Sequence, residues 1–304
     1  MYGPGNGWQL ISNGNFGQNV EFFYSNGTVI PSWLESYSGS SAIWWLKLGS
    51  IPASSSITVY MGIAPTSTNL FNTVNDGEAP QLTCPNPSDT ASCSTYAEYD
   101  DGANVFNYYT NFAGTSLPSG WSVTQGGGSP FNYTIENGLL LQTGSSGSAV
   151  IQYTTRPFNF QTNVLEALGA METNGCMEFG AGLLDNDGPC GGPNSTGIGT
   201  DTNDLYYWIR PDGDDEVGFP NPIHVGTTLY VMSQWESTTQ LYGEINYGDL
   251  DTTSSTFVPD TSLYISVNIA ERTVLNSKMY LQWVRVRAYP PNGVMPSVSF
   301  GSVA

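Results

Sequence analysis

Apolar and polar residues alternate along much of the chain, whereas long stretches with a helical period of apolar residues are absent. Successive side chains of a β-strand point to opposite faces, so a period of two predicts strands with one buried face. The clearest alternating runs are residues 57–63, 205–209, 229–235, 241–247, 263–269 and 280–289. We therefore expect a protein built from many short strands.

The last of these runs reads Tyr-Leu-Gln-Trp-Val-Arg-Val-Arg-Ala-Tyr and is followed by two prolines. Its alternation places Arg285 and Arg287 on one face. We expect Trp283, Val284 and Val286 to pack in a closing strand. The two arginines are expected at the exposed or inter-sheet edge of that strand.

Asn-Gly and Asp-Gly pairs, which favour tight turns, begin at residues 13, 26, 137, 187, 212 and 292. Many strands at short spacing, joined by such turns, predict an all-β sandwich or barrel. The composition changes between residues 75 and 103, where a Pro-, Asn- and Ser-rich stretch separates two cysteines. We place the domain boundary there, with a small β-sandwich over residues 1–97 and a larger one over residues 98–304.

The charge balance is strongly acidic, with 26 Asp and Glu against 7 Lys and Arg, a formal net charge of −19. Binding to nucleic acid or to an anionic membrane needs clustered basic residues, so both are excluded as partners. Only 11% of the residues are charged, which suggests a secreted protein with an uncharged polar surface. Adaptation to an acidic habitat and an ordinary glycosylated exoprotein both fit this composition.

The cysteines form two local pairs, Cys84 with Cys93 and Cys176 with Cys190, each spanning a loop-like stretch. Four cysteines allow three pairings, and the two local disulfides are the simplest. Disulfides indicate an oxidising compartment, so we expect an extracellular or cell-surface protein. Three glycosylation sequons, at Asn26, Asn132 and Asn194, agree with this location.

No stretch reaches the ~18 apolar residues of a membrane span. The first residues also lack the charged region and apolar core of a signal peptide. We expect either that a signal has been removed or that the chain begins within a longer reading frame.

Several segments resemble a known arrangement of surface-protein domains. Residues 20–36, 42–48 and 51–61 include Pro-Ser-Trp-Leu-Glu and Ile-Pro-Ala. They resemble a domain of unknown function of archaea and bacteria that precedes a concanavalin A-like lectin/glucanase (laminin G-like) domain. Residues 111–121, 137–141 and 280–301 resemble the opening, second and closing strands of that second domain.

The resemblance implies a C-terminal concanavalin A-like jelly roll. Two departures matter. Residues 1–19 are short and rich in Gly and Asn, so the first sheet is expected to lack a strand. Relatives often carry acidic residues where this chain has Thr110-Asn111 and Gln282, which weakens the case for the structural calcium ion of those relatives.

Glucanases of this fold carry two carboxylates on one strand in a Glu-x-Asp-x-x-Glu arrangement, as acid and nucleophile. No stretch of this chain satisfies that spacing. Glu166, Glu172 and Glu178 are the nearest candidates, and we interpret them as solvated strand residues. We therefore expect no catalytic residues and no enzyme activity.

We expect no cofactor, with a bound calcium ion as the alternative. Asp185, Asp187, Asp212 and Asp214 lie in acidic turns and have the oxygen ligands that calcium prefers. Asp and Gly are also the usual residues of turns, and the EF-hand spacing is absent.

Aromatic rings are the remaining candidates for ligand contacts, because they stack on the C–H faces of sugars. About half of the rings in alternating strands must face the core. On this argument Tyr206, Trp208, Tyr230 and Tyr242 lie opposite the aliphatic faces and are the candidate ligand-binding residues. In the run 229–235, Trp235 is expected on the opposite face from Tyr230.

The sequence thus predicts a non-enzymatic surface or secreted protein that binds a glycan or a neighbouring surface protein. One alternative is a structural subunit of a surface layer or filament, which would self-associate through an unfilled sheet edge. A glycoside hydrolase is a second alternative.

Overall fold

The computed structural model describes residues 16–38, 41–85, 92–125, 131–143, 148–172, 176–182, 195–200, 208–211, 217–218, 224–253, 262–270, 278–290, 293–294, 296–299 and 301. The fold is all-β, as predicted, with short helices only in the described ranges. None of these helices is long and apolar enough to cross a membrane. The residues preceding Phe16, and with them most of the segment expected to lack a strand, lie outside the described ranges.

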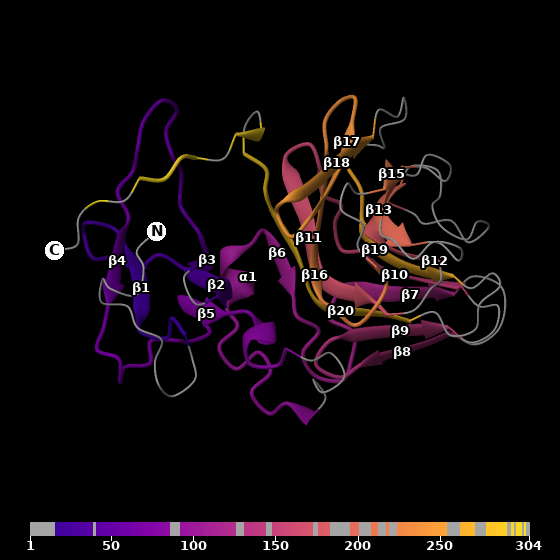
Figure 1. The fold of residues 1–304 in the computed structure, drawn as a ribbon, viewed down its shortest axis with the longest axis horizontal. Coiled ribbons are helices and arrows are strands. Elements are labelled where there is room, and N and C mark those ends of the chain that lie inside the picture. Colours follow the sequence, from indigo (N-terminus) through magenta and orange to yellow (C-terminus); the bar gives the residue numbers. More distant parts are fainter. Residues whose placement is uncertain are drawn as a thin grey trace. The chain divides into compact units, whose positions relative to one another are not determined.

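The chain divides into two compact units (Figure 1). The first unit comprises residues 1–109 and 295–304, and the second comprises residues 110–294. The sequence placed the boundary at residues 97 and 98. Residues 98–109 pack instead with the first unit, since the rings of Phe106 and Tyr109 lie 5.2 and 5.7 Å from that of Trp33.

The described residues of the first unit form two small sheets. Antiparallel strands β1 (Val20–Phe23) and β4 (Tyr60–Ile63) form one. The other has the order β3-β2-β5, in which β2 (Ser32–Ser38) pairs antiparallel with β3 (Ser41–Leu46) and parallel with β5 (Asp76–Glu78). The helices are η1 (Pro80–Leu82) and α1 (Gly102–Val105), and strand β6 (Tyr108–Thr110) spans the division between the units.

Two clusters of buried residues contribute to the core in the described part of the first unit. One is built on Phe16, Leu34 and Phe71, and the other on Val20, Phe22 and Ile30. Trp44 packs against both, so it joins the two small sheets into one unit.

The second unit is a jelly roll of two sheets, as predicted. We call one of them the β12 sheet. Its strand order is β15-β14-β13-β12-β19-β10-β7. The strands are β7 (Trp121–Gln125), β10 (Ser148–Tyr153), β12 (Cys176–Gly182), β13 (Ser195–Thr200), β14 (Trp208–Pro211), β15 (Val217–Gly218) and β19 (Ile265–Ala270).

We call the other sheet the β11 sheet. Its strand order is β18-β17-β16-β11-β20-β9-β8. The strands are β8 (Phe131–Ile135), β9 (Leu139–Thr143), β11 (Asn163–Met171), β16 (Tyr230–Glu236), β17 (Leu241–Ile245), β18 (Asp249–Thr253) and β20 (Lys278–Ala288).

The core of the second unit lies between these sheets. Alternate residues of β11, β16 and β20 are almost fully buried against the β12 sheet, as are their counterparts on β12, β13 and β19; they include Leu165, Ala167, Met232, Val284, Val286, Phe179, Ile198 and Val267. Gln234 reaches across this core, and its Nε2 donates to the carbonyl of Phe179 at 2.9 Å. The opposite face of the β11 sheet is its outer face.

Strand β20 corresponds to the closing run of the sequence, and Trp283, Val284 and Val286 are buried as predicted. Its position differs from the prediction, because β20 lies in the interior of the β11 sheet between β11 and β9. Arg285 is therefore fully buried rather than at an edge. The register with β11 shifts after Leu168, so that Gln282 forms a bulge.

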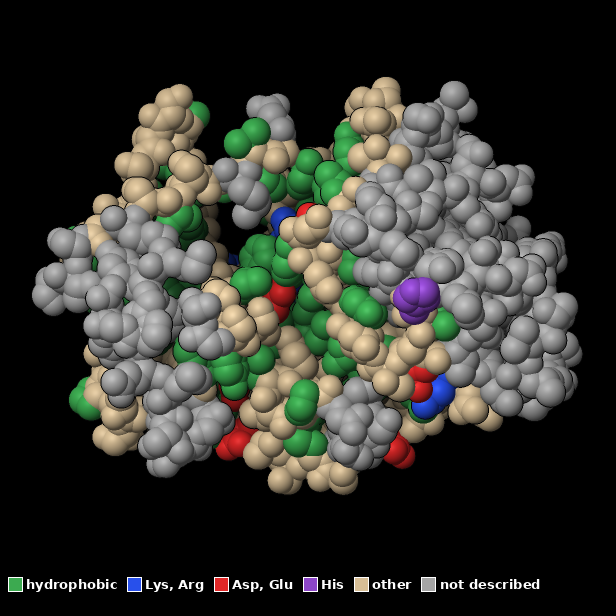
Figure 2. All heavy atoms as spheres, viewed as in Figure 1, with side chains coloured by type: hydrophobic (Ala, Val, Ile, Leu, Met, Phe, Trp, Pro, Cys, Tyr) green, Lys and Arg blue, Asp and Glu red, His purple; other side chains and the backbone are tan. Residues whose placement is uncertain are grey.

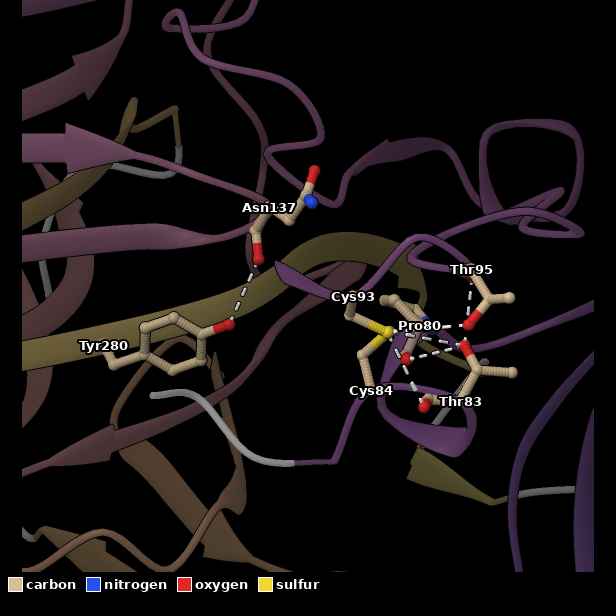
Figure 3. Close-up of a disulfide and its surroundings, with 7 residues drawn as sticks. All are labelled: Pro80, Thr83, Cys84, Cys93, Thr95, Asn137 and Tyr280. Carbon is tan, nitrogen blue, oxygen red and sulfur yellow. Dashed lines mark hydrogen bonds between the residues drawn. A yellow bond between two sulfur atoms is a disulfide. The ribbon is translucent and has the colours of Figure 1, made fainter. Parts of the chain in front are cut away.

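The predicted Cys84–Cys93 disulfide is present (Figure 3). It links residues nine apart, just after η1. The Thr83 hydroxyl lies beside it and donates to the carbonyls of Pro80 and Thr95 at 3.4 and 3.2 Å. The bridge therefore ties Cys93 to the segment just after η1.

Candidate functional site on the outer face of the β11 sheet

Neighbouring strands place a charged cluster on the outer face of the β11 sheet. Glu166 of β11 lies directly opposite Arg285 of β20 on one side and Ser233 of β16 on the other. Residues paired in this way point to the same face. Because side chains alternate, Arg287 also lies on this face.

Glu166 is held by several groups at once. Arg285 Nε donates to Oε2 at 2.6 Å, while Arg287 Nε and Nη2 lie 3.0 and 2.9 Å from Oε1. The Ser233 hydroxyl donates to Oε1 at 3.1 Å. The Glu166 and Arg285 side chains are fully buried, whereas 14% of Arg287 remains exposed. This is a desolvated ion cluster with charge-assisted hydrogen bonds, which are stronger than neutral ones.

Burial by itself would raise the pKa of the Glu166 carboxyl, but Arg285 and Arg287 reverse that effect and lower the pKa below its usual value. The two arginines therefore favour the ionised form of Glu166. Arg285 is fixed further by a 2.6 Å hydrogen bond from its Nη2 to the Tyr247 hydroxyl. Its guanidinium also lies over the Trp283 ring, 4.6 Å from the centroid, a favourable cation–π geometry.

Three aromatic rings form a row on the same face; we call Trp235, Tyr242 and Tyr289 the aromatic row. Trp235 of β16 and Tyr242 of β17 are direct cross-strand partners, and their rings stack 5.2 Å apart at an angle of 4°. Tyr289, which follows β20, places its ring 5.7 Å from that of Trp235. All three residues are half-buried, and the Nε1 atom of Trp235 is buried.

Alternation explains why the row faces outward. Leu241 and Ile245 of β17 are buried in the core, which puts Tyr242 and Glu244 on the outer face. Tyr242 is thus on the predicted face, and its hydroxyl donates to Gln240 Oε1 at 2.9 Å.

In β16 the facing is the reverse of the prediction. Met232 and Gln234 point into the core, so Trp235 faces outward, and Tyr230 lies on the face of Met232. The apolar character of Val231 and Trp235 predicts the inward face for both, and the strand pairing places both on the outer face instead. Gln234 is polar, yet it is buried between the sheets.

Glu244 is the second carboxyl group on the outer face. It lies opposite Ser233, which in turn lies opposite Glu166. Partial burial raises the pKa of Glu244, and the Glu166 charge adds to the effect, while Arg287 opposes it. One carboxyl with a lowered pKa therefore lies two strands from one with a raised pKa.

The other two candidate glutamates lie elsewhere. Glu172 forms a salt bridge with Lys278 at 2.5 Å, and Glu178 belongs to the β12 sheet. The interpretation of these residues as solvated was wrong for Glu166 and Glu178, whose exposed fractions are 0% and 1%, and the Glu172 side chain is only 8% exposed. The signal that could have located the cluster was the pair Arg285 and Arg287, since two cations on one buried face require an acidic partner.

Several predicted site residues lie outside the described ranges: Tyr206, Asp185, Asp187, Asp212, Asp214, Cys190 and Asn194. The backbone of Trp208 opens β14 and that of Cys176 opens β12, but their side chains are not among those described. Asn26 and Asn132 are exposed, so both sequons are accessible.

In the part of the chain that the structure describes, no group of three or more His, Cys, Asp or Glu side chains is arranged to hold a metal ion. Figure 2 shows one face of the molecule, on which uncharged side chains and backbone cover most of the described area. This agrees with the low content of charged residues in the sequence.

A family model described as "Domain of unknown function (DUF2341)" matches residues 16–79. The N-terminal part of the resemblance is thereby confirmed. A curated relative is "Uncharacterized protein 562" of Sulfolobus islandicus rod-shaped virus 1, which is 29% identical over 322 residues. The match covers 95% of this chain and 53% of the relative, so the chain spans about half the length of that protein.

Solved structures similar to this one include a β-glucanase of Bacillus licheniformis, with 16% identity, a TM-score of 0.41 and coverage of 59% of this chain and 97% of that one. A glycosyl hydrolase family protein of Mycobacterium fortuitum has 13% identity, a TM-score of 0.44 and coverage of 60% and 99%. At such identities these likenesses concern the fold and carry no conclusion about activity.

Proposed function

We propose that this chain is an extracellular or cell-surface protein that binds a glycan, without cleaving it, on the outer face of the β11 sheet. The observation that carries the proposal is the aromatic row. Its three half-buried residues come from three different strand regions, and their rings meet on one face. Such rings pack against the apolar faces of sugar rings, while adjacent polar groups bind the hydroxyls.

The polar groups beside the row suit this role. The buried Glu166–Arg285–Arg287 cluster fixes its members in place, and preorganised groups lose little entropy on binding. Arg287 and Glu244 are partly exposed and can donate to or accept from sugar hydroxyls. The Cys84–Cys93 disulfide supports the extracellular location, since disulfides persist in oxidising compartments.

Binding without cleavage is favoured by the state of Glu166. A glycosidase needs one carboxyl group that protonates the leaving group and a second that attacks or activates water. Glu244 has the raised pKa expected of an acid. Glu166, however, is fully buried and bound by two arginines and a serine, so it is poorly placed to attack or to activate water.

A glycan array followed by calorimetric titration tests the proposal. Saturable binding of a glycan is expected, and Tyr242→Ala should weaken it about tenfold, because loss of one ring contact costs about 1.4 kcal/mol. Tyr133→Ala, which removes a tyrosine that is 42% exposed on β8, is the matched control and should bind normally. Absence of binding across the array, or equal losses in both variants, would refute the assignment.

Hydrolysis is tested on the same glycans. We expect no release of reducing sugar by the wild-type chain. If reducing sugar is released and Glu244→Gln abolishes the release, the chain is a hydrolase instead.

A structural subunit of a surface assembly is the second candidate, and one observation favours it. Strand β4 pairs with β1, and it exposes Tyr60, Met61 and Ile63, with exposed fractions of 46, 39 and 37%. Because β1 and β4 form a two-stranded sheet, β4 is an edge strand, and an edge strand with exposed apolar side chains is suited to pairing with another chain. Light scattering across a concentration series tests this, and a monomer at high concentration argues against it.

A further inference from the structure

Three carboxyl groups are buried close together in the first unit. Asp76 and Glu78 are the end residues of β5, and Asp101 directly precedes α1. Their exposed fractions are 3, 5 and 1%. We call these three residues the acid cluster.

Asp101 points at the middle of β5. A Cβ atom placed on Gly77 would overlap the Asp101 carboxylate, so this position accepts only glycine. Within the described residues, the two carboxylate oxygens of Asp101 have no hydrogen-bond partner. The same holds for Oε1 of Glu78. A buried ionised carboxylate without partners is strongly disfavoured, and such a group takes up a proton instead.

The neighbouring Asp100 shows the contrast. Its Oδ1 accepts hydrogen bonds from Trp33 Nε1 at 2.8 Å and from the Gly102 amide at 3.0 Å, and its Oδ2 accepts one from the Tyr109 hydroxyl at 2.5 Å. Asp100 is thus built to carry a charge, whereas Asp101 is not.

The charged groups that act on the cluster are acidic. Glu21 of β1 acts on Asp76, Glu98 and Asp100 act on Glu78, and Asp100 also acts on Asp101. The polar partners of Asp76 are Ser32, whose hydroxyl donates at 3.3 Å, and Asn72.

Basic residues are scarce in this unit. Lys47 is the one Lys or Arg of the sequence in residues 1–109, and residues 295–304 contain none. Its Nζ donates to the carbonyl of Asn104 at 2.6 Å. The acid cluster is therefore surrounded by like charge.

We infer that the acid cluster is a proton-dependent latch, which holds β5 against β2 when its carboxyl groups are protonated and loosens when they ionise. The latch acts on a short element, since β5 pairs with β2 over three residues. Two backbone hydrogen bonds would weaken when the latch loosens. The amide of Glu78 donates to the carbonyl of Tyr99 at 3.0 Å, and the amide of Ala79 donates to the carbonyl of Leu34 at 2.8 Å.

The electrostatics agree with this geometry. Burial, reinforced by the acidic neighbours, raises the pKa of Asp76 to about 6, of Glu78 to about 7 and of Asp101 to about 8. In the unfolded chain these groups titrate near 4. The folded state therefore binds more protons between those limits, and its stability is greatest below about pH 4 and falls as the pH rises towards 8.

Hydrogen exchange read by mass spectrometry tests the latch on the whole chain. Protection factors, corrected for the intrinsic pH dependence of exchange, are compared at pH 5 and pH 8. We expect the peptide that contains β5 to lose protection at least tenfold at pH 8, while the peptide that contains β11 in the second unit keeps its protection.

Asp101→Asn removes one titrating group with almost no change of shape, and it should reduce the difference between the two pH values. Glu78→Gln neutralises a different member and serves in its place if Asp101→Asn does not fold. Glu136→Gln, at an exposed position of the second unit, is the control and should behave like the wild type.

Equal protection of β5 at both pH values in the wild type would overturn the inference. So would a stoichiometric gain of β5 protection at pH 8 on addition of Ca²⁺, because the cluster would then hold a cation rather than protons.

Discussion

Glu166 receives hydrogen bonds from three side chains, and each comes from a strand adjacent to β11. A fully buried ion pair gains Coulomb energy but must first be desolvated, so the net gain from the pair is small. Loss of one partner is different, because it leaves a buried charge without compensation. Substitution of Glu166 should therefore have a large effect on stability if the ion cluster is present.

Glu166→Gln should lower the free energy of unfolding of the second unit by about 3–5 kcal/mol, because Arg285 would remain buried without its anion. Urea unfolding measures this value. Glu172→Gln is the matched control. The Glu172 side chain is 8% exposed, but that of its partner Lys278 is 31% exposed and can remain hydrated, so a smaller loss of about 1 kcal/mol is expected. Similar losses in both variants would show that Glu166 is not the centre of a buried cluster.

At the scale of the element, alternation of apolar and polar residues located several of the strands correctly. The runs at 241–247, 263–269 and 280–289 became β17, β19 and β20. Strand β5 was missed because Asp-Gly-Glu contains no apolar residue and has the composition of a turn. The facing of β16 was inverted because Gln234 is more deeply buried than the half-buried Trp235, which reverses the usual relation between polarity and burial.

The candidate site was predictable only in part. Tyr242 was expected on the outer face, but Tyr289 and the Glu166 cluster required knowledge of which strands are neighbours. Glu166 and Arg285 are 119 residues apart in sequence. Period-2 patterns report the face of a residue within its own strand and contain no information on strand order.

The disulfide gives an element-scale prediction. The link closes a short loop of sequence separation nine, so the chain-entropy model assigns it about 2–3 kcal/mol. Replacing both Cys84 and Cys93 by serine should lower the stability of the first unit by this amount in denaturant unfolding, and should leave the second unit unchanged. An unchanged first unit would mean that η1 and its loop are held by other contacts.

At the scale of the whole molecule, the net charge of −19 dominates. Close carboxylates repel one another in the folded state, and dissolved salt screens that repulsion over about 10 Å at 0.1 M. The two arginines of the Glu166 cluster account for two of the seven basic residues, so few remain to balance the surface.

Raising NaCl from about 20 mM to about 0.5 M should therefore raise the unfolding temperature at pH 7.5 and have less effect near pH 4, where carboxylates begin to protonate. Differential scanning calorimetry at the two pH values measures both shifts. An equal effect of salt at both pH values would argue that ion-specific effects, rather than repulsion between carboxylates, govern the response.

The interior position of β20 has a consequence for synthesis on the ribosome. Strand β9 ends at Thr143 and β11 at Met171, whereas β20 begins at Lys278, which is 135 and 107 residues later, so both strands are complete long before the strand that lies between them. At about 5–20 residues per second these intervals take roughly 5–27 s. During that time two strand edges remain unpaired in the nascent chain, and a chaperone or rapid export would protect them from pairing with other chains.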